Sequence, residues 1–328
     1  MATVNTSYAT LVDIAAEGTE KTLVEILNQR NPILEDIPWL ECNDGSGHKT
    51  KIRSGLPTPT WRALYQGVQP TKGTVVAVRD SCGNLEDFGE VDELEYDLAG
   101  DDRDTWRMNE DAAHIESMGQ TAASTLFYGN VTTSPEKFHG LAPRYNALSG
   151  VNTAENIVSA AGAGSDNTSI WLVGWGQTSC HGIFPKGTAA GLKAENLGKQ
   201  VNQQSDGSRY TVLMSKYSWQ LGLTLRDWRK VGRVCNIDVS DVRGTVNNQK
   251  ALITYLIQLI ERVEEPDGGG RQILYANKTI TSALRQGIVE KVSNNLTFDT
   301  VNGRRVLAFD GIEIHRADAL LNTEAAIT

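Results

Sequence analysis

Two pairings of cysteine with histidine are the first places in the sequence where side chains could perform catalysis or bind a metal. Cys180 and His181 are adjacent, and nucleophilic catalysis uses a thiol beside an imidazole. Neighbouring residues of a strand point to opposite faces of a sheet, so we expect these two side chains not to meet. Cys42 and His48 offer two metal ligands, but a structural site needs about four. Neither pair therefore predicts a catalytic or metal site.

Two further segments carry side chains that could bind ligands. The acidic segment from Glu86 to Asp104 could hold a divalent cation through its carboxylate oxygens, but it lacks the spacing of an EF-hand loop. Trp61 and Tyr65 lie among arginines and lysines, an arrangement that can stack on nucleobases. A contact between these aromatic residues and a neighbouring subunit is the alternative that we prefer.

The sequence lacks the motifs of common catalytic sites. It contains no G-x-S-x-G elbow, no H-E-x-x-H zinc helix and no G-x-x-x-x-G-K-[ST] phosphate loop. Gly162-Ala-Gly164 comes nearest to a dinucleotide fingerprint, but the third glycine and the helix after it are missing. We expect no catalytic residues, no cofactor and no metal. A site assembled from distant residues would leave no local motif, so a hydrolase stays open as an alternative.

Composition excludes several classes of protein. The 328 residues carry a net charge of −9, whereas proteins that bind DNA phosphates tightly are usually basic. The N-terminus has no signal peptide, and no apolar run of about 18 residues exists, so we expect no membrane contact. The four cysteines are widely spread without a C-x-x-C motif, which predicts reduced thiols in a protein made in a cytoplasm.

The longest predicted element is a helix over residues 104–130. Asp104 can cap its first turn, and Gly129-Asn130 can end it with a positive φ. Its length of about 36 Å is about twice that of an average helix. Such a helix suggests a spine to which strands attach, and the alternative is a core helix of an ordinary α+β enzyme. Apolar residues recur at helical spacing at Trp106, Ala112, Ala113, Ile115, Met118, Ala122, Ala123, Leu126 and Phe127.

An apolar strip and a basic loop precede this helix. After a short helix that begins near Thr22, the residues Ile33, Leu34, Ile37, Trp39 and Leu40 need cover from their own domain or from a neighbouring subunit. Residues 43–73 contain five glycines and three prolines between predicted strands at Thr50–Arg53 and Thr74–Val78. We interpret this segment as a long extended loop or hairpin, because structureless loops of this length are rare unless they have a function.

Charge changes sign along this part of the chain. Between residues 49 and 79 there are six basic residues and no acid, whereas residues 86–104 hold ten acidic residues and one basic residue, Arg103. Opposite charges of this kind predict a head-to-tail contact, with the basic loop of one copy on the acidic segment of the next. The alternative is two solvated runs of charge without a partner.

The C-terminal half alternates predicted strands with two helices. We expect helices at Asn248–Val263 and at Thr279–Lys291, the second capped by Thr279 or Thr281. Asn302-Gly303 predicts a tight hairpin between the last long strands. The fold class is therefore α+β. Strands are expected at Ser169–Trp175, Arg209–Tyr217, Trp219–Val234, Ile273–Ala276, Leu296–Val301, Arg305–Phe309 and Gly311–His315.

Nearly the whole chain, from about residue 20 to 322, resembles the major capsid proteins of tailed bacteriophages, especially those of some short-tailed phages. The resemblance rests on the order of several segments: NPILEDIPWLE, GHKTKIRSGLPTPTWRALYQGVQPTKG, SCGNLEDFGEVD, ASTLFYGN, GLAPRYN, SDNTSIWLVGWG, RDWRKVGRVCNID and VLAFDGIEIHRADALL. It implies the HK97-like capsid fold. The expected parts are an N-terminal arm (1–49), an extended loop (50–80), a peripheral domain with the spine helix (81–144, helix 104–130), an axial domain (145–291) and C-terminal strands that complete the sheets (292–328).

The resemblance implies assembly and no catalytic turnover. Pentamers and hexamers would form an icosahedral shell, a virion capsid, around double-stranded DNA that is not bound tightly. Certain members of this family cross-link their subunits through a Lys–Asn bond, but no residue here can be matched to that site, so we expect no cross-link. Other members carry a long scaffolding segment ahead of the arm, for which the roughly 20 residues before the arm helix are too few. We therefore expect a separate scaffolding protein and little or no N-terminal processing. A portal protein is a further expected partner, and a cement protein remains open. The alternatives are a tail or portal component, or the hydrolase. The candidate contacts between subunits are Ile33, Leu34, Ile37, Trp39, Arg53, Trp61, Arg62, Tyr65, Lys72, Glu86, Asp87, Glu90 and Glu93.

Overall fold

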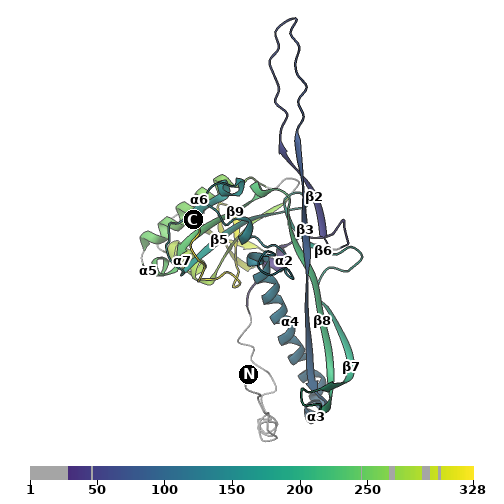
Figure 1. The fold of residues 1–328 in the computed structure, drawn as a ribbon. Helices are drawn as coiled ribbons and strands as arrows, with labels where there is room; N and C mark the ends of the chain where they lie inside the picture. The colour runs from purple at the N-terminus through teal and green to yellow at the C-terminus, as the bar shows by residue number, and fades with distance from the viewer. Residues whose placement is uncertain (1–28, 46, 245, 266–269, 290–295, 302–303) are drawn as a thin grey trace. The chain divides into compact units, whose positions relative to one another are not determined.

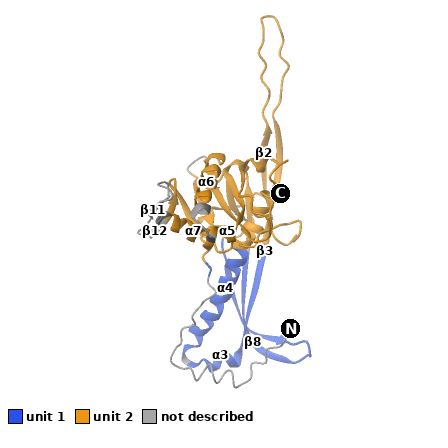
Figure 2. Cartoon of the chain, turned by 90° about the vertical axis from the view of Figure 1, so that its left-hand side faces the viewer, with its two compact units in different colours: residues 1–29, 84–122, 191–219 blue, residues 30–83, 123–190, 220–328 orange. Residues whose placement is uncertain are grey.

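The computed structural model describes residues 29–45, 47–244, 246–265, 270–289, 296–301 and 304–328 (Figure 1). The helix expected near Thr22, most of the expected arm and the turn at Asn302-Gly303 lie outside these residues. The described chain divides into two compact units (Figure 2). Unit 1 contains Gln29 and residues 84–122 and 191–219, and unit 2 contains residues 30–83, 123–190 and 220–328.

Unit 1 consists of a short helix, most of a long helix, a hairpin and the end of a long strand. Strands β7 and β8 form an antiparallel hairpin that places Lys193 opposite Ser218. The side chain of Arg107 ties the helix to both strands, because its Nη2 donates to Asn196 (3.2 Å) and to Ser215 (2.9 Å). Its elements are β3 (Thr74–Asp92), α3 (Glu93–Leu98), α4 (Arg103–Tyr128), β7 (Lys193–Gln203) and β8 (Arg209–Leu225), and β3, α4 and β8 also contribute residues to unit 2.

The predicted long helix is α4, with two corrections. It begins at Arg103, so Asp104 lies in its first turn and accepts a hydrogen bond from the Tyr96 hydroxyl at 2.6 Å. Gly129 follows the last helical residue but has no positive φ. A Cβ there would lie 2.5 Å from the Phe138 carbonyl oxygen, so a close backbone approach explains this glycine. The apolar face is buried only from Met118 onward, and Ala112, Ala113 and Ile115 are exposed.

Unit 2 is built on a mixed sheet in which β5 is the central strand. Strand β5 pairs with β10 and β9 in antiparallel fashion, and its last residue pairs with β6 in parallel. Its elements are α2 (Ile33–Asp36), β1 (Trp39–Glu41), β2 (Gly47–Gly55), β4 (Ile157–Ser159), β5 (Asn167–Trp175), β6 (Cys180–Phe184), β9 (Val231–Asp238), α5 (Val239–Gly244), α6 (Val246–Arg262), β10 (Arg271–Ala276), α7 (Lys278–Val289), β11 (Leu296–Val301), β12 (Arg304–Phe309) and β13 (Ile312–Arg316).

Both faces of β5 are covered, so every residue of the strand is buried. Ile170 and Leu172 point into an apolar core shared with α6 and α7. Trp171 points to the opposite face, where its ring packs against Phe127 and Tyr145. The continuous apolar run SIWLVGW is what a strand covered on both faces requires. The prediction of a buried strand here is confirmed.

Most other predicted elements are present, and three local details differ. The strand expected at Thr74–Val78 extends to Asp92 as β3. Helix α7 is capped by Asn277, whose Oδ1 accepts from the Ile280 N–H at 2.9 Å, and not by Thr279 or Thr281. The expected strand over 219–234 is interrupted after Leu225. Asp227 causes the break, because its carboxylate accepts from the N–H of Arg229 at 3.1 Å and turns the chain.

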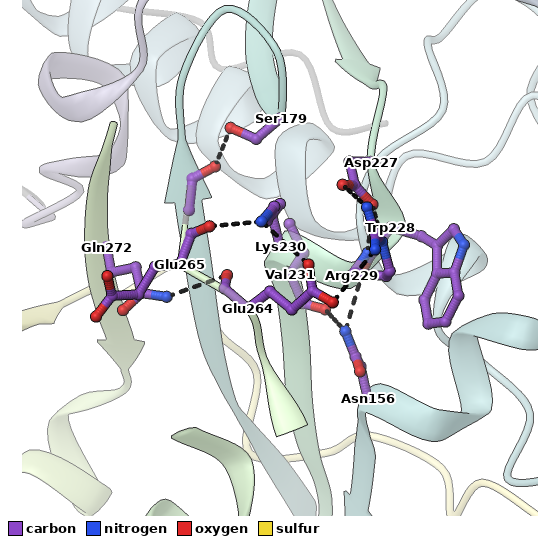
Figure 3. A network of polar contacts seen from close by, with 11 residues as sticks. Asn156, Ser179, Asp227, Trp228, Arg229, Lys230, Val231, Glu264, Glu265 and Gln272 are labelled. Atoms are coloured by element: carbon purple, nitrogen blue, oxygen red, sulfur yellow. Dashed lines mark hydrogen bonds and ion pairs between the residues drawn. The ribbon is translucent and has the colours of Figure 1, made fainter. Parts of the chain in front are cut away.

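This turn belongs to a polar network that connects β9 to the end of α6 (Figure 3). The buried Lys230 ammonium donates to the Glu264 carboxylate (3.2 Å) and to the Glu265 carbonyl (2.5 Å). Arg229 binds both Asp227 (2.8 Å) and Glu264 (3.2 Å). The RDWRK segment therefore has a structural role inside unit 2.

Candidate assembly interface

The predicted basic loop is a hairpin of unit 2 whose base is a regular ladder. Strands β2 and β3 are antiparallel, with His48 opposite Asp80 and Arg53 opposite Val75. Between them, residues 56–73 have no regular secondary structure and form the long projection that Figure 1 shows beyond β2 and β3. Its tip is a turn in which the Gln66 N–H donates to the Ala63 carbonyl at 3.2 Å. Tyr65, the third residue of this turn, has a φ of 65°, the positive value that a type II turn requires at that position.

The side chains of this projection are exposed to solvent. Every residue from 56 to 72 is exposed, and the relative exposure reaches 101% for Trp61 and 103% for Tyr65. Large aromatic side chains are usually at least half buried in a folded chain. A cluster of them at the end of a projection is typical of a surface that is buried in a complex. Leu56 and Leu64 extend the apolar surface, with exposures of 77% and 83%.

The basic residues of the hairpin differ in their partners. Lys49 and Arg79, at the base, each lie 3.3 Å from the Asp44 carboxylate. Arg53, Arg62 and Lys72 are exposed and form no ion pair with another described residue. The distal part of the hairpin therefore presents positive charge beside its aromatic side chains.

The four acidic candidates already have partners inside unit 1, which the sequence could not show. Those partners come from β7, β8 and α4, far away in the sequence. Exposed pairs of this kind contribute about 0–1 kcal/mol each to the free energy of unfolding, so each adds little to the stability of unit 1. The pairs are Glu86–Lys216 (3.4 Å), Asp87–His114 (2.7 Å), Glu90–Asn202 (2.6 Å) and Glu93–Lys199.

The apolar strip is covered by the chain itself, one of the two possibilities that the sequence left open. Ile33 and Ile37 have relative exposures of 0% and 4%, so they have no surface left for a neighbouring subunit. Leu34 and Trp39 are half-buried. Strand β1 pairs in parallel with β6, which places Trp39 opposite Gly182.

A buried carboxylate fastens α2 to the sheet of unit 2. Asp36 Oδ2 accepts from the Tyr275 hydroxyl (2.8 Å) and contacts His315 Nδ1 (2.7 Å), while Trp175 Nε1 donates to Tyr275 (2.8 Å). Burial opposes a charge on His315, but hydrogen bonds to Asp36 and Glu313 outweigh burial and raise its pKa. These contacts show that the apolar strip is part of the folded body.

Replacing Gly182 with alanine is expected to lower the free energy of unfolding by about 1–3 kcal/mol, because the added methyl group overpacks the strip. Its Cβ would lie 2.5 Å from the Trp39 ring and 2.7 Å from Ile37 Cγ2. Urea unfolding of both proteins measures the difference. Gly119→Ala is the control: nothing lies within 4 Å of its Cβ, and alanine in a helix should stabilise by about 0.5–1 kcal/mol. Equal stability of Gly182→Ala and the natural chain would contradict this packing.

The cysteines and histidines considered for catalysis or metal binding have other neighbours in the structure. His181 is fully buried and packs edge-on against the His48 ring, with a distance of 5.6 Å between ring centroids. Cys42 Sγ lies 3.5 Å from Cys82 Sγ, a contact between distant residues for which the sequence had no signal. Among the described residues, no group of three or more His, Cys, Asp or Glu side chains could hold a metal ion. No helix in the described ranges is long and apolar enough to cross a membrane.

Comparisons with solved structures show which proteins have a chain similar to this one. A chain in the near-atomic structure of bacteriophage Epsilon15 is 35% identical to this chain, with a TM-score of 0.75, and the match covers 100% of both chains. Two other solved structures are more distant. The capsid of a native GTA particle is 8% identical with a TM-score of 0.46, and the match covers 67% of this chain and 94% of that chain. The SrpI encapsulin complex from Synechococcus elongatus PCC 7942 is 12% identical with a TM-score of 0.45, and the match covers 69% of this chain and 95% of that chain. A search of curated proteins gives no match.

The fold is thus α+β and HK97-like, the fold of phage capsid proteins. The sequence model of the family described as major capsid protein GP7 matches residues 15–328. The chain belongs to this family, and it is the major capsid protein of a tailed phage and a component of its virion. The family is structural and not an enzyme family, so the hydrolase alternative has no support, nor has the tail or portal alternative.

Proposed function

We propose that copies of this chain assemble as pentamers and hexamers into an icosahedral shell around double-stranded DNA, with the hairpin of one copy on the surface of the next. The observation that carries the proposal is the full exposure of Trp61 and Tyr65 on a projection of a capsid-family chain. Trp, Tyr and Arg are the residues that dominate binding energy at protein interfaces. The net charge of −9 supports a container that does not bind its DNA tightly.

Fewer residues are proposed to contact a neighbouring subunit than the sequence alone suggested. Trp61, Arg62 and Tyr65 form its centre, with Arg53, Lys72, Leu34 and Trp39 at the margins. The receiving surface includes Glu86, Asp87, Glu90 and Glu93, whose exposed internal pairs can exchange for a partner's cation at small cost. Ile33 and Ile37 no longer belong to the set, because their own unit buries them.

We keep the arm (1–49), extended loop (50–80), peripheral (81–144), axial (145–291) and C-terminal (292–328) divisions as proposed parts of the subunit. Residues 191–219 are the exception: they fall within the axial division but group with residues 84–122, so we propose that they belong to the peripheral part. A separate scaffolding protein and a portal protein are proposed partners, and a cement protein is a further candidate. Synthesis in the cytoplasm of a bacterial host belongs to the same proposal.

The double variant Trp61→Ala, Arg62→Ala is expected to abolish most shells, because each hot-spot residue contributes about 2 kcal/mol to its contact. Electron microscopy of purified protein counts shells and five- or six-fold rings. The matched control, Trp61→Phe with Arg62→Lys, retains the aromatic ring and the charge and should assemble. Unfolding of dissociated subunits should be unchanged in both variants, because these side chains are fully exposed.

Two outcomes would contradict parts of the proposal. Equal numbers of shells from the natural chain and the alanine variant would remove the hairpin residues from the contact and leave the capsid assignment intact. A natural chain that forms no shells or rings, even when co-expressed with its scaffolding protein, would contradict self-assembly into a shell.

A further inference from the structure

Two thiols of unit 2 lie in contact although they are 40 residues apart in sequence. Cys42 follows strand β1 directly, and Cys82 lies on β3. Their Sγ atoms are 3.5 Å apart, and both cysteines are free. A disulfide bond is about 2.05 Å long, so the sulfur atoms need to approach by only about 1.5 Å.

Independent backbone pairings hold the two cysteines at this distance. The Cys42 N–H donates to the Phe184 carbonyl at 2.9 Å, which continues the pairing of β1 with β6. Cys82 lies against Gly222 of β8, where an added Cβ would be 3.2 Å from the Cys82 Cα. The thiols therefore meet because two different strand pairings bring their backbones together.

A cross-link between these two cysteines would enclose the whole projection. A bond between residues 42 and 82 would close a loop that contains β2, the whole projection 56–73 and the first part of β3. A cross-link that closes a long loop stabilises mainly by restricting the unfolded chain. It would fix the base of the hairpin and leave its tip free.

We propose that Cys42 and Cys82 form an oxidation site, in which a peroxide converts the two thiols into a disulfide within one chain. The half-buried Cys82 meets the oxidant first, because Cys42 has a relative exposure of only 3%. The Cys82 thiolate attacks a peroxide oxygen and the O–O bond breaks, which gives a sulfenic acid and hydroxide. The hydroxide takes up the proton that the Cys82 thiol released and becomes water. The Cys42 sulfur then attacks the sulfenic sulfur and displaces its hydroxide. In total, two thiols and one hydrogen peroxide give one disulfide and two waters, with two electrons passing from sulfur to oxygen.

The same environment keeps the reaction slow. Burial raises the pKa of both thiols, and the neighbouring thiol raises that of Cys82 further. Because only the thiolate is a good nucleophile, the pair stays reduced in a cytoplasm with thiol reductants. Resting on the proposed function, we place the oxidation after the virion leaves its host, when exposure to an oxidising medium is long.

The test is treatment of the purified full-length chain with hydrogen peroxide, followed by alkylation under denaturing conditions and mass spectrometry. We expect a loss of about 2 Da, two fewer alkylated thiols and a peptide that links Cys42 to Cys82. The midpoint of thermal unfolding should rise by roughly 5 °C and return on reduction. Cys42→Ser and Cys82→Ser should each abolish the link.

Cys180 and Cys235 provide matched controls, since both are fully buried. Cys180→Ser and Cys235→Ser should form the Cys42–Cys82 link as the natural chain does. The proposal would be overturned by four reduced thiols after treatment, by sulfinic or sulfonic acid at Cys82 without a link, or by a link to Cys180 or Cys235. Mass spectrometry detects the cross-link in unassembled chains as well as in shells. The result is therefore independent of whether the chain assembles.

Discussion

Replacing Glu324 with glutamine is expected to lower the free energy of unfolding by about 3–5 kcal/mol, because it leaves the charge of Arg233 buried without a counter-ion. The two side chains are 4% and 7% exposed, and Arg233 Nη2 lies 2.7 Å from Glu324 Oε2. The carboxylate also accepts hydrogen bonds from Tyr128 (2.5 Å) and Ser169. Glu324 therefore fastens the C-terminal segment to β5, β9 and the end of α4. Urea unfolding followed by circular dichroism and tryptophan fluorescence measures the loss.

An exposed ion pair gives the matched control for this prediction. Lys193 and Glu195 lie 3.6 Å apart with side chains 74% and 54% exposed, so Glu195→Gln should cost less than about 0.5 kcal/mol. Replacing Arg233 with methionine as well should recover part of the Glu324→Gln loss, because no buried charge then remains. Similar costs for Glu324→Gln and Glu195→Gln would show that the buried pair does not have this role.

Acidification from pH 7 to 4.5 is expected to destabilise unit 2 through His181 by on the order of 2–3 kcal/mol. Burial, the His48 ring and Arg226 lower the pKa of His181 to about 4, while the Gly176 backbone acts in the opposite direction. An unfolded histidine has a pKa of about 6.5, so between pH 6.5 and 4 the unfolded chain binds a proton that the folded chain excludes. The full contribution of neutral His181 to the free energy of unfolding is therefore present above pH 6.5, and it is lost as the pH falls toward 4.

Two variants separate this effect from other titrations. The pKa of His48 is also lowered, by burial and by Arg226 against the opposing charge of Asp80. His181→Leu should make the free energy of unfolding depend less steeply on pH between 7 and 4.5. His315→Gln should make it steeper, because the raised pKa of His315 gives stability below pH 6.5 that is lost as the pH rises. Urea unfolding at several pH values measures both slopes, and equal slopes for His181→Leu and the natural chain would contradict the assignment to His181.

Local patterns predicted the elements of this fold well. Helices α4 and α6, the buried strand β5 and the hairpin of β11 and β12 follow from apolar periodicity and turn residues that lie within a few positions of one another. The basic hairpin was predicted from its glycines, prolines and charges. Errors occurred where a single side chain decides the boundary, as Asn277 does at α7 and Asp227 does between β8 and β9.

Contacts between distant residues were beyond prediction from local patterns. The acidic residues from Glu86 to Glu93 find their cations at Lys199 and Lys216, more than 100 positions away. Cys42 meets Cys82, and His181 meets His48, only because separate strand pairings bring them together. Such contacts depend on sheet topology, for which no single segment carries the information.

The open projection from residue 56 to 72 has a consequence for how this protein can evolve. Substitutions at exposed positions usually change folding stability by less than about 0.5 kcal/mol, so selection for a folded subunit hardly constrains these residues. In the assembly proposed above, the constraint on these residues comes from the surface that they contact on the neighbouring copy. Changes in the projection should therefore appear together with changes in that receiving surface, whereas the core around β5 should vary independently of both.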